Sequence, residues 1–335
     1  MIKMITKPDR LYRIPASEAT ANRLYAGVDL GSNTFRLIIA RLHDGRIEPV
    51  VKQLHAVRLG EALHRTGRLS EQAIRRALAT LAGYRALLDR HRPTAVRICG
   101  TAALRAAANR EEFLREAAVI LGQAAEVIDG EEEARLSGIG AYAAMRARTP
   151  EPLLLADVGG GSSELLVATD SPNGPVITAS VSLPLGAVHL SESFLHAEPP
   201  AARELAAMAA HIDEVMIPAL AAMAPLPKTV VGIGGTATAL AALDCNLSVY
   251  DGDRIQDHRL AGDTLDAILA RLCHLTGTER NRLPGLGDGR GEIILGGLMI
   301  FLSLLKALPA PRLTVSDGGL LEGILLSAAG SNGPA

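Results

Sequence analysis

Asp29-Leu-Gly-Ser-Asn-Thr-Phe-Arg-Leu-Ile-Ile-Ala40 is echoed 128 positions later by Asp157-Val-Gly-Gly-Gly-Ser-Ser-Glu-Leu-Leu-Val-Ala168. Each copy has an aspartate, a turn of small residues and then an apolar run of strand length. A second repeat follows at an offset of 135, where Cys99-Gly-Thr-Ala-Ala-Leu104 recurs as Gly234-Gly-Thr-Ala-Thr-Ala239. Two elements repeated in the same order predict two related halves that face each other across a cleft.

Each half presents an aspartate and glycine-rich turns to this cleft. Glycine-rich turns expose backbone N–H groups to phosphate oxygens, and a nearby aspartate holds a cation. The pattern therefore favours a metal-bound polyphosphate as the ligand.

Length and composition predict two globular domains with aliphatic cores. The chain has 335 residues, 48% of them apolar and none of them tryptophan, and about 100–200 residues make one domain. Cys99, Cys245 and Cys273 show no disulfide or zinc spacing, which is typical of reduced, buried thiols in a cytoplasmic protein. The nine histidines show no ligand spacing, and no Ser-His-Asp or Cys-His pairing indicates a protease or serine hydrolase.

No segment has the pattern of a membrane span. The longest uncharged apolar run, Ile293–Leu305, is too short to cross a bilayer. The N-terminus lacks the apolar core of a signal peptide. We therefore expect no membrane partner.

Charge is divided unevenly between the halves. Residues 1–150 hold 24 Lys and Arg against 16 Asp and Glu, a net charge of +8, whereas residues 151–335 hold 10 against 20, a net charge of −10. Arginine supplies most of the positive charge, and its planar fork binds phosphate in bidentate fashion. The asymmetry favours a polyanion as the ligand of the first half. The alternative is an arginine-rich composition with the side chains on solvated helix faces.

Strand and helix signals alternate twice, which predicts an α/β protein with two sheets. In the first half, Tyr25–Asp29 and Phe35–Leu42 read as a hairpin, Ser70–His91 as a helix with Ser70 as its cap, and Asn109 as the start of a helix with a capping box. Further predicted elements are a helix over Glu131–Arg148, strands over Leu153–Val158, Leu165–Ala168 and Val176–Ser182, and helices over Ala201–Met223, Ile293–Leu308 and Leu320–Ala328.

Asp29 and Asp157 are the candidate metal ligands. A lone aspartate after a strand is often only a turn residue, but the second copy argues against that interpretation. Two carboxylates at symmetric positions suit one Mg²⁺ or another divalent cation, held directly or through water. Glu164 is a candidate third, outer-sphere ligand, and the alternative is a solvated strand residue.

Three glycine-rich turns are candidate phosphate cradles. Arg105 stands one helical turn after Thr101 at a predicted helix start, where it could grip a phosphate. The turn residues are Gly31, Ser32, Asn33 and Thr34; Gly159, Gly160, Gly161 and Ser162; and Gly234, Gly235 and Thr236.

Three consecutive glutamates, Glu131, Glu132 and Glu133, begin a predicted helix. Acids in a first turn stabilise the helix dipole by about 0.3–1 kcal/mol each, which explains at least two of them. A glutamate that leans into the cleft could accept a proton from an attacking water. Helical phase turns Glu131 away but does not choose between Glu132 and Glu133.

Six motifs together resemble the exopolyphosphatase/guanosine pentaphosphate phosphatase family, in the family's order over about residues 24–328. They are Val28-Asp-Leu-Gly-Ser-Asn-Thr34, Gly100-Thr-Ala-Ala-Leu-Arg105, Gly130-Glu-Glu-Glu-Ala-Arg135, Asp157-Val-Gly-Gly-Gly-Ser162, Gly234-Gly-Thr236 and Ser316-Asp-Gly-Gly319. The resemblance implies the duplicated ribonuclease-H-like domains of the actin, sugar-kinase and heat-shock-chaperone superfamily, with an interdomain cleft. We expect the first domain over residues 1–135, the second over 136–319, and a last helix, 320–335, that packs back on the first.

The resemblance also implies roles for single residues. The family's catalytic glutamate, directly before Ala in Gly-x-Glu-Glu-Ala, corresponds to Glu133. Its magnesium-associated acids correspond to Asp29, Asp157 and Glu164, and its phosphate loops to the three turns above. Arg290-Gly-Glu292 loosely resembles a family element on the second-domain side of the cleft. The chain resembles the short, two-domain form, without the helical C-terminal domain of longer members.

These features predict a Mg²⁺-dependent exopolyphosphatase, in which water attacks the terminal phosphorus of polyphosphate and orthophosphate leaves. One alternative is hydrolysis of guanosine pentaphosphate at its 5′-terminal phosphate, a reaction of the stringent response. Others are an ATP-dependent sugar or acid kinase, and a non-catalytic filament protein or phosphate or nucleotide sensor. The expected assembly is a homodimer in the cytoplasm, with no nucleic-acid partner.

Overall fold

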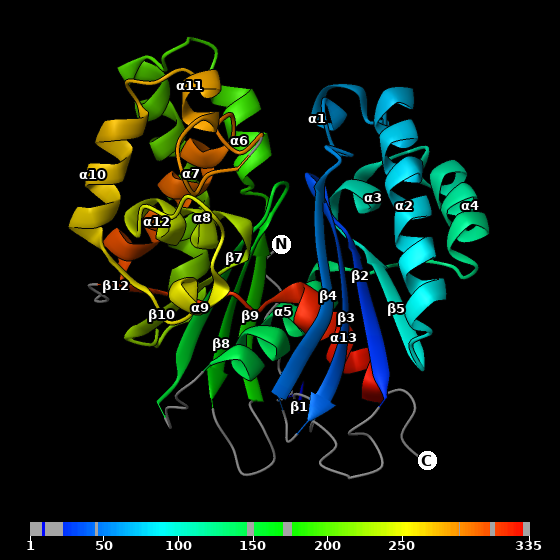
Figure 1. Ribbon diagram of the computed structural model, residues 1–335. Coiled ribbons are helices and arrows are strands. Elements are labelled where there is room, and N and C mark those ends of the chain that lie inside the picture. The colour runs from blue at the N-terminus through cyan, green and yellow to red at the C-terminus, as the bar shows by residue number, and fades with distance from the viewer. Residues whose placement is uncertain are drawn as a thin grey trace. The chain divides into compact units, whose positions relative to one another are not determined.

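The computed structural model describes residues 9–10, 23–43, 46–145, 151–169, 176–287, 289–308 and 312–330. Its contacts divide the chain into two compact units, each with its own sheet (Figure 1). The first unit is Leu11–Ala144 with Gly318–Ala335, and the second is Met1–Arg10 with Met145–Asp317. The sequence places the division after residue 135. In the structure it follows Ala144, because helix α5 (Gly130–Ala144) belongs as a whole to the first unit.

The first unit is built on a five-stranded sheet in the order β4-β3-β2-β5-β6. Strands β2 (Leu24–Leu30), β3 (Thr34–His43) and β4 (Arg46–Ala56) are antiparallel neighbours, and β5 (Ala95–Gly100) and β6 (Glu126–Val127) run parallel to β2. The predicted hairpin is confirmed, and its register sets Asp29 opposite Arg36.

Helices cover both faces of this sheet (Figure 1). Side chains alternate along β2, so Ala26 and Val28 join one core with α2 (Glu71–His91) and α4 (Arg110–Leu121). Gly27 lies against α13 (Leu320–Gly330) on the other face. Two short helices, α1 (Leu63–Thr66) and α3 (Ala102–Ala106), lie in the connections.

The two predicted caps have different outcomes. Ser70 caps α2 as predicted, because its Oγ accepts the N–H of Ala73 at 3.1 Å. The capping box predicted at Asn109 is wrong. The Asn109 side chain instead accepts the N–H of Leu69 at 2.8 Å and donates to its carbonyl at 3.1 Å. The Asn109 side chain therefore makes a tertiary hydrogen bond in place of the helix cap that the local sequence pattern predicts.

Helices α5 and α13 cross at backbone contact in the first unit. A Cβ on Gly140 would lie 1.9 Å from the Gly319 carbonyl oxygen, and one on Gly323 would lie 1.9 Å from the Leu136 carbonyl oxygen. No side chain fits at either position, so the crossing requires both glycines. Helix α5 ends at Ala144, and Arg148, where the sequence predicts its end, lies outside the described residues.

The second unit has a seven-stranded sheet in the order β1-β9-β8-β7-β10-β12-β11. Strands β7, β8 and β9 are antiparallel neighbours, and β10 and β12 continue the sheet parallel to β7. Short strands β1 and β11 pair antiparallel at the two edges. The bounds are β1 (Asp9–Arg10), β7 (Leu153–Val158), β8 (Ser163–Thr169), β9 (Val176–Leu183), β10 (Thr229–Ile233), β11 (Arg259–Ala261) and β12 (Arg312–Val315).

The helices of the second unit build one large aliphatic core with its sheet. By length and composition, α7 (Ala202–Ala222) could cross a membrane, a weak criterion that core helices of folded domains also meet. It buries Met208, Ile212 and Met216 on one face against the core. The other helices are α6 (Ala187–Phe194), α8 (Gly234–Asp244), α9 (Gly252–Ile255), α10 (Gly262–Leu272), α11 (Gly277–Asn281) and α12 (Ile294–Ala307).

The two sheets repeat one plan, which confirms the duplication read from the sequence. In each unit a strand with an aspartate as its penultimate residue, β2 or β7, lies inside the sheet. Two antiparallel strands follow it on one side, and parallel strands that come later in the chain follow it on the other. The predicted mixed α/β class with two sheets is therefore confirmed. The cleft expected between the units stays a prediction.

Candidate active site

The first repeated turn joins β2 to β3. It is closed by the N–H of Gly31, which donates to the Thr34 carbonyl at 3.2 Å, and a Cβ on Gly31 would lie 2.7 Å from that oxygen. The carbonyls of Ser32 and Asn33 accept N–H groups from the loop after β4. Among the described residues, no hydrogen bond uses the N–H groups of Ser32 and Asn33. The turn therefore has the N–H groups that an anion cradle needs.

Asp29, beside this turn, is held by an arginine on the next strand. The Asp29 side chain is buried. Its Oδ2 accepts Nε of Arg36 at 2.8 Å and lies 2.7 Å from Nη2. This charge-assisted pair fixes the carboxylate and offsets its charge. Sequence reasoning missed Arg36, although the 128-residue offset already aligned it with Glu164.

Glu133 and Arg105 lie together in the first unit. Glu133 is 9% exposed in the first turn of α5, and Arg105 is on α3, directly after β5. Nη1 of Arg105 donates to Oε2 of Glu133 at 2.5 Å and to the Ile128 carbonyl at 3.0 Å.

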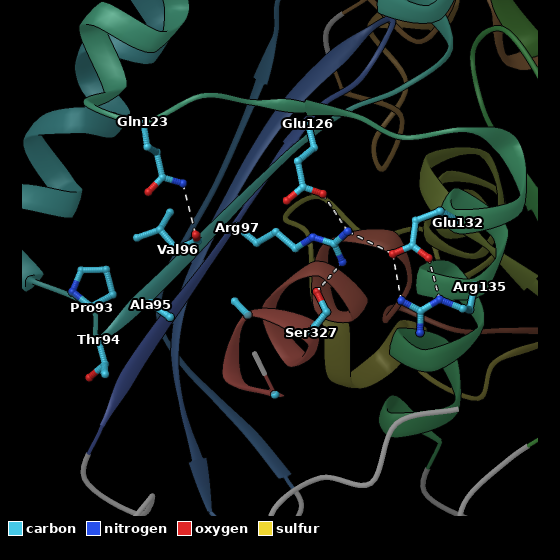
Figure 2. Close-up of a pocket in the computed structure, with 12 residues that line it drawn as sticks. Pro93, Thr94, Ala95, Val96, Arg97, Gln123, Glu126, Glu132, Arg135 and Ser327 are labelled. Atoms are coloured by element: carbon cyan, nitrogen blue, oxygen red, sulfur yellow. Dashed lines mark hydrogen bonds and ion pairs between the residues drawn. The ribbon is translucent and has the colours of Figure 1, made fainter. Parts of the chain in front are cut away.

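The structure separates Glu132 from Glu133. Glu132 lies in a different pocket, where its carboxylate accepts hydrogen bonds from Arg97 and Arg135 (Figure 2). Successive helical residues point about 100° apart. This rotation places the carboxylate of Glu133 beside Arg105 and that of Glu132 beside Arg97.

The second repeated turn joins β7 to β8 and is closed in the same way as the first. The N–H of Gly159 donates to the Ser162 carbonyl at 3.0 Å. The carbonyls of Gly159 and Gly160 accept the first N–H groups of α6. No hydrogen bond among the described residues uses the N–H groups of Gly160, Gly161 and Ser162. The two turns thus agree in backbone geometry as well as in sequence.

Asp157 has a second carboxylate opposite it. In the β7–β8 register its partner is Glu164, which is 1% exposed and accepts the Ser182 hydroxyl at 2.9 Å. The interpretation of Glu164 as a solvated strand residue is therefore wrong. Asp157 is half-buried and Glu164 is buried, and a nearby cation favours the charged form of two carboxylates at neighbouring strand positions. Such a pair is suited to a divalent cation.

The third turn begins α8 and touches Asp157. Gly234 has φ of 81°, and a Cβ there would lie 2.5 Å from Oδ1 of Asp157. Glycine is required on both grounds. Thr236 is buried and donates its hydroxyl to the Val158 carbonyl at 3.3 Å. The N-terminus of α8, whose dipole favours negative charge, therefore stands beside the acid pair.

Arg290 adds a guanidinium to this turn. Its Nη1 donates to the Gly235 carbonyl at 2.9 Å, and a Cβ on Gly235 would lie 3.2 Å from its Nη2. The sequence resemblance drew attention to Arg290 but assigned it no role. Contact with a predicted phosphate turn makes it a candidate phosphate ligand of the second unit.

The predicted metal ligands fall into two groups. Asp157 and Glu164 are cross-strand neighbours in the second unit, and Asp29 is paired with Arg36 in the first. Among the described residues, no cluster of three or more His, Cys, Asp or Glu side chains could hold a metal by itself. A Mg²⁺ ion commonly uses one or two carboxylates together with substrate phosphates and water, and the acid pair fits that donor set.

The cysteines differ partly from expectation. All three are free, but only Cys99 is buried, whereas Cys245 and Cys273 are half-buried. Burial raises the pKa of Cys99 to about 12. A Cys-His contact that the sequence did not indicate does occur, with Sγ of Cys245 3.6 Å from Nδ1 of His258. Burial also raises the pKa of the Cys245 thiol, which disfavours a nucleophilic thiolate there.

Comparison with known proteins fits this arrangement. Residues 38–332 match the model of the Ppx/GppA phosphatase family. The chain belongs to this family. Proteins named exopolyphosphatase 2 from two Mycobacterium tuberculosis strains are 35% identical to it over 319 residues, which is 91% of this chain and 98% of theirs.

Solved structures of this phosphatase family have the same fold. A Ppx/GppA member from Aquifex aeolicus has a TM-score of 0.79 at 30% identity and covers 93% of this chain and 99% of its own. An exopolyphosphatase from Cytophaga hutchinsonii has a TM-score of 0.84 at 26% identity, with 92% and 98% covered. An exopolyphosphatase-like protein has a TM-score of 0.85 at 31% identity, with 91% and 97% covered.

Proposed function

We propose that this member of the Ppx/GppA phosphatase family is an exopolyphosphatase, a phosphoanhydride hydrolase that releases orthophosphate from the end of linear polyphosphate. Family membership and the names of its relatives support the reaction class. The observation that carries the proposal is the pairing of buried Glu133 with Arg105, in a unit whose first turn has N–H groups suited to an anion.

Glu133 is the proposed general base. Its pairing with Arg105 holds the carboxylate in place before substrate binds. When a terminal phosphate takes over the guanidinium, Glu133 is released to orient an attacking water and accept its proton. A positioned base contributes about 10²–10⁴-fold to such a reaction. Positioning and charge stabilisation supply most of the remainder in phosphoryl transfer.

The three turns and the two arginines are the proposed phosphate ligands. N–H groups of the Ser32-Asn33 and Gly160–Ser162 segments, with the N-terminus of α8, supply donors without mobile side chains. Arg105 and Arg290 add charge that neutralises the phosphate oxygens as the bridging bond breaks. The proton accepted by Glu133 comes from the water, whose oxygen joins the released orthophosphate.

A Mg²⁺ ion, or another divalent cation, is the proposed cofactor. Asp157 and Glu164 would hold it, because they are carboxylates at directly opposed positions of neighbouring strands, which a divalent cation can bind together. Asp29 would contribute through water, since Arg36 already offsets its charge. When bound, the ion would neutralise phosphate charge in the ground state and in the transition state.

Hydrolysis of guanosine pentaphosphate, the stringent-response reaction, is the second candidate, and family membership favours it over a kinase or a sensor. The chemistry at Glu133 would be the same, with an added site for the guanine base. An ATP-dependent kinase would instead form ADP when an acceptor is added. A sensor would bind polyphosphate without turnover. We also propose a role in phosphate metabolism as a cytoplasmic homodimer, without nucleic-acid or membrane partners.

Phosphate release from medium-length polyphosphate tests the proposal. We expect release with Mg²⁺ that a chelator abolishes and added Mg²⁺ restores. Guanosine pentaphosphate is assayed in parallel at equal phosphate-end concentration. Faster release from the nucleotide would transfer the assignment to the second candidate. Failure to release phosphate from either substrate would overturn the proposed function.

A further inference from the structure

The first unit has a large pocket that is separate from the candidate phosphate ligands. It measures about 930 Å³ and lies between the start of β5, the segment before β6, the first turn of α5 and the end of α13 (Figure 2). Pockets of roughly 300–1,000 Å³ hold small-molecule ligands. Its walls are mixed: Val96 and Ala328 are apolar, whereas Arg97 and Arg135 present guanidinium groups.

Four charged side chains alternate in sign along the pocket, in the order Glu126, Arg97, Glu132 and Arg135 (Figure 2). Nη2 of Arg97 donates to Glu126 at 2.9 Å and to Glu132 at 3.0 Å, and its Nη1 donates to Oγ of Ser327 at 2.9 Å. A single guanidinium nitrogen, Nη2 of Arg97, thus serves two carboxylates.

The two acids are held very differently. Glu132 accepts three hydrogen bonds, which include 2.6 Å and 2.8 Å contacts from Arg135. Burial alone would raise the pKa of Glu132, but the hydrogen bonds and charges of Arg135 and Arg97 hold it below its usual value. Within the described residues the Glu126 carboxylate pairs with Arg97 alone, and its side chain is 58% exposed. The Glu126 side chain can therefore turn away from Arg97 into solvent at a small cost in free energy.

An incoming anion would take the position of Glu126 on Arg97. A dianionic phosphate binds a guanidinium more strongly than a single carboxylate does. Nη1 of Arg135 makes no hydrogen bond within the described part of the chain, so it is a second donor for the same group. The pocket is far larger than phosphate itself, and its apolar walls suit a small organic remainder.

The pocket connects to the proposed catalytic residue through one peptide unit. Glu132 and Glu133 are consecutive in the first turn of α5, and the clamp on Glu132 sets the rotation of that turn. An anion that draws Arg97 away from Glu132 would loosen the turn that carries Glu133. Turnover would then fall while the phosphate turns stay intact.

We propose that this pocket is a regulatory site for a small phosphomonoester, whose phosphate replaces Glu126 on Arg97 and whose binding lowers turnover through Glu132. The binding step stands on the pocket alone. The effect on turnover rests on the proposed function, because it acts on the residue assigned as the base.

Two surface variants that change the pocket charge in opposite directions test the binding step. Glu126→Gln removes a negative charge from the pocket, and Gln123→Glu adds one in an isosteric side chain. Binding of ribose 5-phosphate is measured by calorimetry, with ribose as the uncharged control. We expect Glu126→Gln to tighten binding and Gln123→Glu to weaken it, each about two- to fivefold, the range of an exposed ion pair. No binding to the wild-type protein at millimolar concentration, or equal affinities in all three proteins, would overturn the site.

Steady-state kinetics test the coupling. Ribose 5-phosphate should lower kcat on polyphosphate with KM unchanged, and Glu126→Gln should need less of it for half-inhibition. Competitive inhibition that neither variant alters would place the ligand on the polyphosphate site and overturn the inference. Binding without any change in kcat would overturn the coupling. If polyphosphate is not hydrolysed at all, the proposed function fails, and calorimetry still decides the binding step.

Discussion

In the first unit Asp29 on β2 lies opposite Arg36 on the adjacent strand β3. In the second unit Asp157 on β7 lies opposite Glu164 on the adjacent strand β8, at the equivalent position of the register. The turns beside them are closed by equivalent N–H to carbonyl bonds, so the backbone is shared and the charge partner is not. In one copy the aspartate lies opposite a cation, and in the other it lies opposite a second carboxylate. The duplication thus supplied one backbone plan, and a single residue per copy, Arg36 or Glu164, sets the charge opposite the aspartate.

The largest expected effect tests whether the two units have separate roles. Glu133→Gln should lower turnover of polyphosphate by about 10²–10⁴-fold, because the amide cannot accept the proton of water. Magnesium binding should stay near wild type, and substrate binding should not weaken, since loss of the Glu133 carboxylate leaves Arg105 available to phosphate. Turnover is measured by phosphate release and binding by calorimetry. Glu131→Gln, a change of the same kind in the same turn, is the control. Wild-type turnover in Glu133→Gln would refute the role of this residue.

The next effect concerns how the first unit holds α5. Gly140→Ala should destabilise the protein by about 3 kcal/mol or more, because its Cβ would overlap the Gly319 carbonyl and the helices must separate. Gly83→Ala is the matched control. Gly83 lies inside α2, where an added Cβ would meet no heavy atom within 4 Å, so that variant should gain about 0.5–1 kcal/mol. Denaturant unfolding measures both, and equal stabilities would contradict the close crossing.

Metal titration tests whether Glu164, opposite Asp157, contributes to a cation site in the second unit. Glu164→Gln should weaken Mg²⁺ binding by about 10–100-fold, the range for loss of a supporting ligand. The control is Glu214→Gln, which removes an exposed acid from α7 in the same unit. Calorimetry reads the affinity without reference to activity. Unchanged affinity in Glu164→Gln would mean that the carboxylate pair of the second unit does not hold the ion.

The smallest effect is the pH dependence contributed by Glu132. Its folded-state pKa is depressed by Arg135 and Arg97 against the opposing effect of burial. Its stabilisation is therefore present above the unfolded-state pKa and is lost as pH falls through the folded value. The pair is partly exposed, so the change should stay below about 1 kcal/mol. The free energies of unfolding of wild type and Glu132→Gln, measured with denaturant across pH, should differ at neutral pH and converge in acid. A constant difference at every pH would contradict a stabilising contribution from the Glu132 carboxylate.

The duplicated architecture was predictable because its signal is repeated. An aspartate, a closing glycine and a β-type run recur at one offset, and each copy supports the interpretation of the other. The helix cap at Ser70 was predictable for a different reason: its partner, Ala73, is three residues away. Asn109 has the same kind of local pattern, but Leu69, forty residues before it in the chain, takes its side chain.

The site was less predictable than the fold, because its charges are defined by cross-strand partners. Arg36 and Glu164 are equivalent in the repeat, yet one offsets a carboxylate and the other adds to it. The choice between Glu132 and Glu133 depended on which arginine each meets, and Arg97 and Arg105 are about thirty residues away. Helical periodicity alone cannot indicate which arginine lies beside each glutamate.

The glycine crossing of α5 and α13 makes the first unit dependent on a segment that the ribosome produces after the whole second unit. At about 5–20 residues per second, the nascent first unit waits on the order of tens of seconds with one face of β2 uncovered. A premature stop before Leu320 would thus cripple the half of the molecule that was synthesised first.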